Sequence, residues 1–404
     1  MPGGVAIRAR WGEAARLIAD NRDVLDARPG EEPANESPAS LLSRGWSSFL
    51  LSLDDAQLAA LEVLGHEASW PAGTPASLVQ LARAAREVCA IPLLMSAGPS
   101  RPARRAETPR KRAQIDAFAQ LIMPLALRAK RVLDVGSGHG HLTREIASQL
   151  ALPVVGLERD VSLAGRARTL SKAASPSFAV TDVLRDGLPL LEGDCVIGLH
   201  ACGDLGDAMV TGVARCDASI ALVGCCLQKR GALSRAPLCA PPPGLAEALD
   251  LPRALLGLSN LTARDDGVEA TRTENLAGRE RRLALHRLLA AREPTLRLGA
   301  EIDGLNRRAA QQALPLLAAR AFAVRGLPAP SPAAIEEAAR WAHAQHARSR
   351  RLALPRTLLA RALEIHVLLD RALYLEECGF SVTIGALFPA AVSARNLALV
   401  AFRS

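Results

Sequence analysis

Residues 131–147 read Arg131-Val-Leu-Asp-Val-Gly-Ser-Gly-His-Gly-His-Leu-Thr-Arg-Glu-Ile-Ala147. Val132, Leu133 and Val135 predict a buried strand. Apolar residues that recur at helical spacing predict a helix after it: Leu142, Ile146 and Leu150. Three glycines separate the two elements: Gly136, Gly138 and Gly140. Because glycine permits positive φ and a close approach of a ligand, and because a helix N-terminus offers free N–H groups, the stretch predicts a ligand-binding turn.

Glycine spacing alone also suits a dinucleotide fold, in which a pyrophosphate lies on the turn. Asp134 favours S-adenosylmethionine instead, because a carboxylate in the strand just before the turn can hold a ligand's ammonium group. The run Val-Leu-Asp-Val-Gly-Ser-Gly-x-Gly also resembles the first motif of class I methyltransferases. A tight strand-to-helix turn without a ligand is the alternative. The residues of this motif that we expect to bind the cofactor are Asp134, Gly136, Ser137, Gly138 and Gly140.

Acidic residues end the next two apolar runs. Glu158 ends the run that begins at Pro153, and at the tip of a second strand its carboxylate can accept both ribose hydroxyl protons. Asp182 ends the following run. By resemblance to methyltransferases, Asp182 faces the adenine amino group and Val183 packs on the ring.

The order of predicted elements indicates an α/β fold with a Rossmann-like, doubly wound sheet. Further strands are expected over 194–200, 218–226, 380–388 and 396–402, and a helix is expected from about Pro355 to Glu377. We expect four regions along the chain: a helical N-terminal region over 1–112, the first part of the methyltransferase core over 113–228, a mostly helical insert after the fifth strand, covering the substrate, over 229–354, and the last helix and strand pair of the core over 355–404.

The composition of the chain argues against a membrane-spanning or secreted protein. The chain has 404 residues and 49% hydrophobic residues, and it contains neither a long apolar span nor a signal-peptide pattern, so we expect a cytoplasmic protein without membrane contact. Eight cysteines in so long a chain predict reduced thiols. The net charge of +8 favours contact with a polyanion such as RNA, whereas the 3% of aromatic residues argues against a base-stacking platform.

A second group of polar residues follows the fourth and fifth strands: His200, Cys202, Asp204, Cys225, Cys226 and Lys229. In one interpretation they shape the substrate pocket, and Asp204 or Lys229 assists proton removal from the acceptor. In a second they bind zinc, with the ligands His200, Cys202, Cys225 and Cys226. In a third, a cysteine attacks a pyrimidine ring to activate it. The cysteines can also be packing residues without chemistry.

Several motifs resemble the family of methyltransferase-like protein 25. They are Gly-Leu-His-x-Cys-Gly-Asp-Leu over 198–205, Val-Gly-Cys-Cys over 223–226 with Lys229, the helix motif over 370–379, and Ser-x-Arg-Asn-x-Ala over 393–398. The chain departs from the family at Leu227-Gln228, where an aromatic residue is common. The related tRNA ribose methyltransferases share a similar His-x-Cys-Gly, in which His200 lies beside the cofactor.

The resemblance implies an S-adenosylmethionine-dependent methyltransferase that acts on RNA (tRNA or rRNA) and uses His200, Asp204 and Lys229 in catalysis. A protein methyltransferase is the first alternative. A cofactor-binding interaction module without catalysis is the second.

Overall fold

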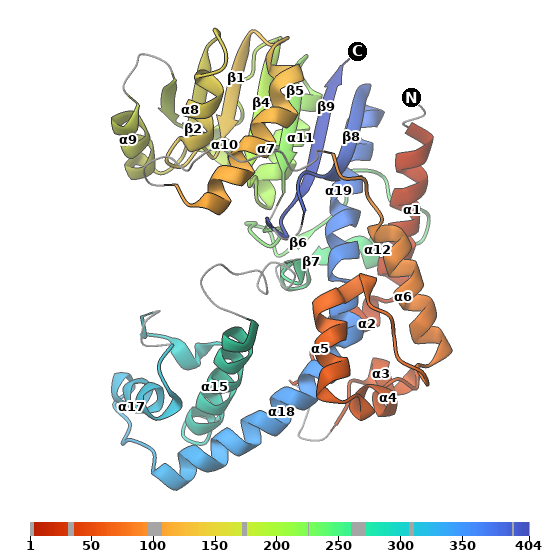
Figure 1. Ribbon diagram of the computed structural model, residues 1–404, viewed down its shortest axis with the longest axis vertical. Helices are drawn as coiled ribbons and strands as arrows, with labels where there is room; N and C mark the ends of the chain where they lie inside the picture. The colour runs from red at the N-terminus through yellow and green to blue at the C-terminus, as the bar shows by residue number, and fades with distance from the viewer. Residues whose placement is uncertain are drawn as a thin grey trace. The chain divides into compact units, whose positions relative to one another are not determined.

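The structure is a computed structural model that describes residues 4–30, 36–94, 107–171, 176–224, 226–259, 272–306, 311–389 and 392–403 (Figure 1). The chain divides into two compact units. The first comprises 1–25, 82–263 and 358–404, and the second comprises 26–81 and 264–357. Each unit combines segments that are distant in the sequence. The four predicted regions, with boundaries at 112, 228 and 354, therefore stay a prediction.

The first unit is built on a seven-stranded sheet of order β3-β2-β1-β4-β5-β9-β8. The strands are β1 (Arg131–Val135), β2 (Val154–Glu158), β3 (Ser177–Val180), β4 (Asp194–Leu199), β5 (Ser219–Val223), β8 (Phe380–Ala386) and β9 (Leu397–Arg403). β1 to β5 run parallel, and β9 lies antiparallel between β5 and β8. The chain order reverses between β1 and β4, which is where open sheets of this kind bind ligands. The predicted fold class is confirmed.

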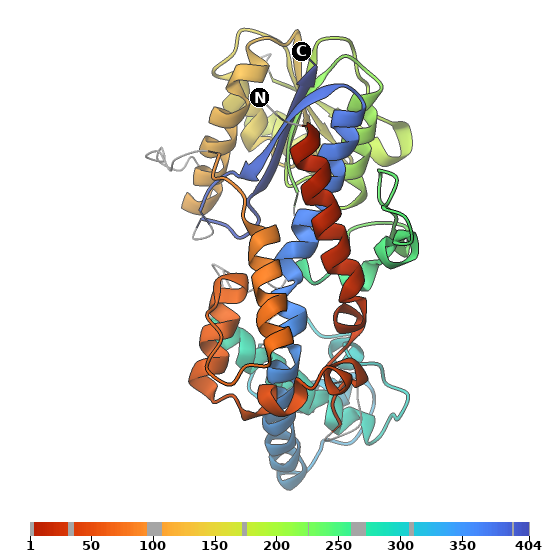
Figure 2. The same cartoon turned by 90° about the vertical axis from the view of Figure 1, so that its right-hand side faces the viewer.

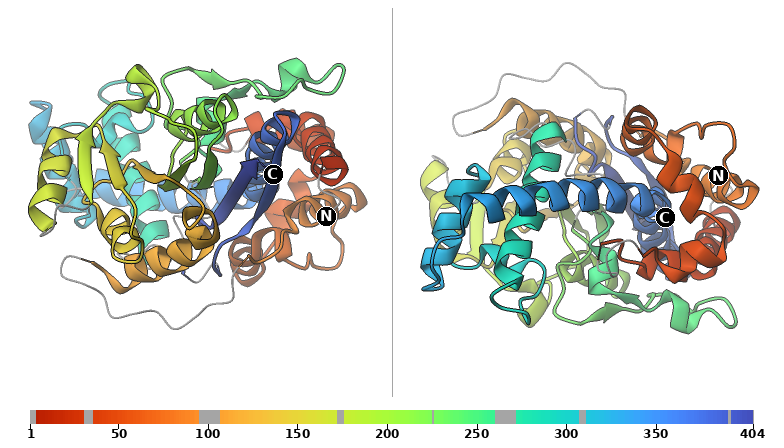
Figure 3. Two further views of the ribbon diagram at one scale, coloured as in Figure 1. Left: turned by 90° about the horizontal axis from the view of Figure 1, so that it is seen from above. Right: turned by 90° about the horizontal axis from the view of Figure 1, so that it is seen from below.

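Helices cover both faces of this sheet, as Figure 3 shows from above. α7 (Pro109–Ala126) and α8 (His141–Ala147) pack together near β4 and β2 on one side. α11 (Asp204–Ala214) and α19 (Ala360–Glu377) pack together on the other, where α11 meets β5 and α19 meets β8. α9 (Val161–Leu170) follows β2, α10 (Val183–Asp186) follows β3, and α1 (Gly4–Asp20) lies along α19 (Figure 2).

The sequence explains why these strands are internal. β1 and β4 are buried along nearly their whole length, which is the pattern of a parallel sheet covered on both faces. Their apolar residues join one core with α7 and α8, in which Phe118 and Ile122 are fully buried. This core fixes the carboxyl ends of the strands, where the candidate site lies.

The helix expected from Pro355 to Glu377 is wrong at its start. Pro355 lies inside α18 (Pro332–Leu358), and α19 begins only at Ala360. The predicted end is right, because Gly379 follows α19 with a φ of 86°.

The second unit is helical. Its helices include α3 (Ala39–Ser43), α4 (Ser47–Ser52), α5 (Asp55–Leu64), α15 (Arg272–Ala290), α17 (Leu314–Val324) and most of α18. α15, α17 and α18 share a core that buries Leu285, Phe322 and Ala342. Glu62 of α5 accepts from Arg350 of α18 at 3.0 Å, which ties the two segments of this unit together.

Among the described residues, no helix combines the length and the apolar content that a membrane crossing requires.

Candidate active site

A cavity of about 240 Å³ opens at the carboxyl ends of β1, β2 and β4, where the strand order reverses. Of the residues predicted from the sequence, it brings together Gly136, Glu158, Asp182, Val183, His200, Cys202 and Lys229. The lining also includes residues that the prediction missed: Val135, Leu157, Arg159, Thr181, Leu184 and Leu205. Most of these residues are next to a predicted residue in the sequence. Their position beside predicted residues is the signal from which they could have been found.

The glycine turn has the backbone conformation that its sequence predicts. Gly136, Gly138 and Gly140 have φ values of 72°, 54° and 69°. A Cβ on Gly140 would lie 2.4 Å from the ring of Phe178, whereas a Cβ on Gly138 would meet nothing within 4 Å. Packing against Phe178 therefore requires glycine at position 140. At Gly138 there is open space beside the turn, which a ligand can occupy.

Glu158 is tied to this turn. One carboxylate oxygen accepts from the backbone N–H of Gly138 at 2.9 Å and the other from that of Asp160 at 3.0 Å. Since each carboxylate oxygen has two lone pairs, Glu158 retains acceptor capacity toward the cavity. The hydroxyl of Ser137 is buried and has no hydrogen-bond partner in the described part of the chain. An unsatisfied buried hydroxyl beside an open turn fits a polar ligand there.

Asp134 faces α8 and is not among the residues that line the cavity. Its side chain is 2% exposed and accepts from the hydroxyl of Thr143 at 2.6 Å. Burial raises the pKa of Asp134 to about 6, although the hydrogen bonds from Thr143 oppose the shift. Asp134 therefore couples the strand before the turn to the helix after it.

Asp182 lines the cavity from the loop that follows β3. Its carboxylate caps α10 by accepting from the backbone N–H of Leu184 at 3.2 Å, and it is half-buried. Val183 beside it is buried against the cavity. A half-buried acceptor next to an apolar wall is suited to the amino edge and ring face of a base.

His200 has a strained backbone. Its φ of 83° is the only positive value that a non-glycine residue adopts in the described part of the chain. The N–H groups of His200 and Ala201 both donate to the carbonyl of Val223 at 3.1 Å, which holds the loop after β4 against β5. Such strain is concentrated at functional sites. The imidazole Nε2 lies 3.4 Å from Oε1 of Gln114 on α7.

The electrostatic surroundings of His200 are cationic. Burial first, and then Arg395, Lys111 and Arg110, lower its pKa to about 4. The ring is therefore neutral near pH 7. None of the three cations was predicted to belong to the site, and two of them stand about 90 residues before His200 in the chain while the third stands far after it. Only the fold could bring them together.

The loops after β4 and β5 are held together by backbone contacts. The N–H of Asp204 donates to the carbonyl of Lys229 at 3.2 Å, and the carboxylate of Asp204 accepts from the N–H of Gly231 at 2.7 Å. Of the two residues proposed for proton removal, Lys229 lines the cavity and Asp204 does not. The exposed ammonium of Lys229 lines the cavity and has no partner among the described residues.

We expect Gly203→Ala to destabilise the protein by about 2–3 kcal/mol and to lower methyl transfer at least tenfold. A Cβ on Gly203 would lie 1.9 Å from the carbonyl oxygen of Lys229, and the residue has a φ of 51°. The matched control is Gly244→Ala, because Gly244 has a φ of 79° and a Cβ added to it would meet nothing within 4 Å. Thermal unfolding of both variants separates the clash from the backbone strain, and equal losses of stability would contradict the clash.

The cysteines do not form a metal centre within the described residues, where no group of three or more potential ligands occurs. Cys202 is disulfide-bonded, so the expectation of a reduced thiol is wrong at this position. Six other cysteines are free, as expected: Cys89, Cys195, Cys216, Cys226, Cys239 and Cys378. A disulfide sulfur is not a thiolate ligand, so Cys202 does not fit the zinc interpretation. Cys226 is a free, buried thiol, and Cys225 lies outside the described residues.

Residues 110–230 match a family model that describes a methyltransferase domain. Solved structures that the chain resembles include the PH0226 protein from Pyrococcus horikoshii OT3, at 18% identity and a TM-score of 0.27, over 30% of this chain and 62% of that one. The plantazolicin methyltransferase BpumL in complex with SAH shares 17% identity at a TM-score of 0.24, over 28% and 48%. The magnesium protoporphyrin IX methyltransferase from Synechocystis PCC 6803 with bound SAH shares 20% identity at a TM-score of 0.23. This match covers 30% of this chain and 61% of that one. This chain spans less than two thirds of each of these proteins.

The family match covers the turn, the strands and the loops that form the cavity. Residues 110–230 therefore carry a methyltransferase domain, and its strands follow the order described above.

Proposed function

We propose that the chain methylates RNA, with tRNA or rRNA as the acceptor, and that it is a cytoplasmic member of the family of methyltransferase-like protein 25. The observation that carries the RNA acceptor is the group of cations around His200, namely Arg110, Lys111 and Arg395. All three lower the pKa of His200, which lines the donor cavity, so their positive potential reaches this cavity. RNA phosphates are attracted by such a potential, which also adds to the net charge of +8.

The residues of the cavity fit the methyl donor. Glu158 would accept from the ribose hydroxyls, Asp182 from the adenine amino group, and Val183 would pack on the ring. The glycine turn and the hydroxyl of Ser137 would meet the remaining polar atoms, and Asp134 would supply the negative charge behind the turn. When it is bound, the donor supplies an activated methyl group on a sulfonium.

On the acceptor side, His200 and Lys229 line the cavity and Asp204 supports the loop that carries Lys229. An acceptor atom that gains the methyl group would lose its proton to solvent. His200 is neutral near pH 7 because of its lowered pKa, so it can accept a hydrogen bond from that acceptor and orient it. In-line geometry contributes more to methyl transfer than a strong base does.

The test is transfer of a labelled methyl group from S-adenosylmethionine to a cell lysate. We expect the label to be lost after treatment with RNase and to survive protease, and we expect the rate to fall steeply with added salt because phosphate contacts are screened. The Asp134→Asn protein serves as the inactive control. Label that survives RNase and disappears with protease would replace RNA by a protein acceptor.

A protein acceptor is the second candidate, and one observation favours it. Apart from His200, no ring lines the donor cavity in the described structure, so a flipped base has no aromatic platform there.

A further inference from the structure

The helical second unit contains a cavity of about 360 Å³ that the proposed function leaves unused. We call it the arginine cavity, after four residues that line it: Arg28, Arg279, Arg282 and Arg356. Its walls come from residues 28–30, from α15 and the chain that follows it, and from α18, and all of these belong to the second unit (Figure 1). Cavities that hold small ligands have volumes of about 300–1,000 Å³, so this one has room for a ligand.

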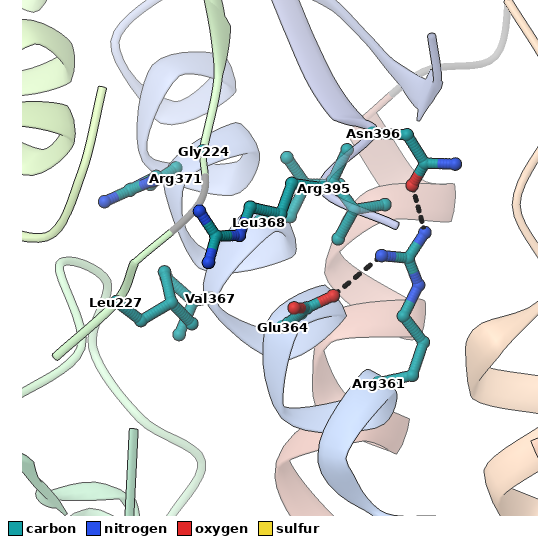
Figure 4. Close-up of a pocket in the computed structure, with 10 residues that line it drawn as sticks. Gly224, Leu227, Arg361, Glu364, Val367, Leu368, Arg371, Arg395 and Asn396 are labelled. Carbon is teal, nitrogen blue, oxygen red and sulfur yellow. Dashed lines mark hydrogen bonds and ion pairs between the residues drawn. The ribbon is translucent and has the colours of Figure 1, made fainter. Parts of the chain in front are cut away.

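A cavity of the first unit provides a contrast. It lies between the end of β5, the start of β9 and α19, and its volume of about 20 Å³ admits one water (Figure 4). Within it, Arg361 donates to Glu364 and to Asn396, each at 2.7 Å (Figure 4). This volume excludes a larger ligand, whereas that of the arginine cavity admits one.

The lining of the arginine cavity is strongly positive. It contains four guanidinium groups and a single carboxylate, that of Glu301. Glu301 is 1% exposed and accepts from Arg282 at 2.9 Å and from the N–H of Gly299 at 2.6 Å. The ring of His346 also lines the cavity and is neutral near pH 7, because burial and then Arg350 lower its pKa. The lining therefore has three more positive than negative charges, and such an excess attracts an anion.

The chemistry of these cations favours a phosphate. The planar fork of a guanidinium matches two oxygens of a phosphate, and arginine is a preferred side chain for this group. Arg279, Arg282 and Arg356 are half-buried, so water screens their charges less than it screens those of exposed side chains. A phosphate monoester carries a charge of about −1.5 to −2 near pH 7, which matches this excess better than a single carboxylate does.

The arginine cavity also has an apolar part, formed by Leu283, Leu298 and Trp341. The guanidinium of Arg287 lies 4.8 Å from the centre of the Trp341 ring and is not among the residues that line the cavity. This cation–π contact holds the ring from outside the cavity. Every base has a flat face that stacks on an aromatic side chain. A ligand that joins a phosphate to a planar ring therefore meets complementary groups at both of its ends.

We propose that the arginine cavity binds one nucleotide, with its phosphate on the arginines and its base against Trp341. Stacking and phosphate contacts are available to every base, so the site accepts all four. Two sources provide this ligand, namely a nucleotide of an RNA strand and a free mononucleotide. The inference does not depend on the RNA acceptor, because a free mononucleotide carries the same two groups.

The experiment is a calorimetric titration of the full chain saturated with SAH, which keeps nucleotides out of the donor cavity. The probes are uridine monophosphate, uridine, inorganic phosphate and eight-nucleotide oligo(U). We expect uridine monophosphate to bind about tenfold more tightly than uridine or inorganic phosphate, because each of these lacks one of the two groups that the cavity binds.

Two substitutions separate the two ends of the nucleotide. Arg356→Gln should lower the affinity for uridine monophosphate about tenfold and leave that for uridine unchanged. Trp341→Leu should lower both affinities about fivefold and leave that for inorganic phosphate unchanged. The control is Arg320→Gln, an exposed position of α17 outside the cavity, which should change none of them. Thermal unfolding checks that each variant is folded, and Arg279→Gln replaces Arg356→Gln if that variant unfolds.

The pattern of binding also identifies the source of the nucleotide. Binding of oligo(U) that Arg356→Gln weakens would assign the site to an RNA strand. Binding of uridine monophosphate, with oligo(U) unaffected by Arg356→Gln, would assign it to a free mononucleotide, and both results support the proposal. Equal affinities for uridine monophosphate and inorganic phosphate would reduce the cavity to a simple anion site and overturn the proposal.

Two further results would overturn it. One is the absence of binding of both uridine monophosphate and oligo(U), and the other is an equal loss of affinity in Arg356→Gln and Arg320→Gln. These titrations do not use the methylated fraction of a lysate, so a failure of the RNA acceptor is recognised separately.

Discussion

Asp207→Asn is expected to lower the free energy of unfolding by about 3–5 kcal/mol, because it removes the charge at the centre of a buried ionic network. The carboxylate of Asp207 accepts from Arg230 at 2.8 Å, from Arg235 at 3.1 Å and from Arg371 at 2.8 Å. Arg235 and Arg371 are at most 3% exposed, so neither can turn to solvent when the charge is lost. Asp370 compensates Arg235 at 2.7 Å and Asp204 lies 3.5 Å from Arg230, but Arg371 has no other carboxylate partner among the described residues.

The pH dependence of this loss gives a second check. The arginines hold the pKa of Asp207 well below its usual range. A carboxyl whose pKa is lowered by folding stabilises the protein fully above its unfolded pKa, near 4, and loses that contribution as the pH falls. The difference in unfolding free energy between the wild-type protein and Asp207→Asn should therefore be constant above about pH 5 and shrink below pH 4.

The control for this substitution is Asp186→Asn. Asp186 pairs with Arg185 at 2.7 Å, but both side chains are exposed, at 42% and 77%. An exposed pair contributes at most about 1 kcal/mol. Chemical denaturation at pH 7.5 compares the two variants. A loss for Asp207→Asn no larger than that for Asp186→Asn would show that the network adds nothing to stability.

The central carboxylate of this network could not be predicted from the sequence. Asp204 and Asp207 both lie in the first turn of α11, and the local sequence offers no reason to distinguish them. The prediction assigned chemistry to Asp204, whereas the structure gives the buried charge to Asp207. What separates them is the position of Arg235 and Arg371, which are distant in sequence and reach Asp207 only through the fold.

The sheet could be predicted because its strands carry local signals. The apolar residues Val132, Leu133 and Val135 indicate a strand that is buried on both faces, and the glycines after them indicate a backbone conformation that other residues avoid. No comparable pattern in the local sequence predicts the break between α18 and α19. Pro355 is the expected boundary, yet the helix continues to Leu358. Tertiary packing decides this boundary, since α19 is buried along most of its length.

The donor side of the site was likewise more predictable than the acceptor side. Gly136, Glu158 and Asp182 follow strands in a fixed order along the chain, so their convergence is a consequence of topology. Arg110 and Arg395 are far apart in the sequence and approach His200 only in the folded protein. The local sequence therefore gives no signal that these two residues act on His200.

Asp134→Asn is expected to weaken the binding of S-adenosylmethionine and of SAH at least tenfold and, at the same time, to stabilise the protein without cofactor. Folding raises the pKa of Asp134 to about 6, so the stability of the wild-type protein falls as the pH rises from about 4 to 6 and stays lowered above that range. A shift of this size costs about 3 kcal/mol at neutral pH. Asparagine retains an acceptor for Thr143 and removes the buried charge, so the variant should gain about 1–3 kcal/mol at pH 7.5 and nothing near pH 4.

Comparison with Thr143→Val separates the effect of the charge of Asp134 from the effect of its packing against α8. It removes the hydroxyl that donates to Asp134 at 2.6 Å and leaves the buried carboxylate without this partner. We therefore expect it to destabilise the cofactor-free protein by about 1–3 kcal/mol while it also weakens binding. Calorimetric titration with SAH and thermal unfolding with and without SAH measure both effects. Opposite changes in stability with a common loss of affinity would show that the cofactor uses the charge of Asp134. Unchanged affinity in Asp134→Asn would show that the carboxylate serves only to join β1 to α8.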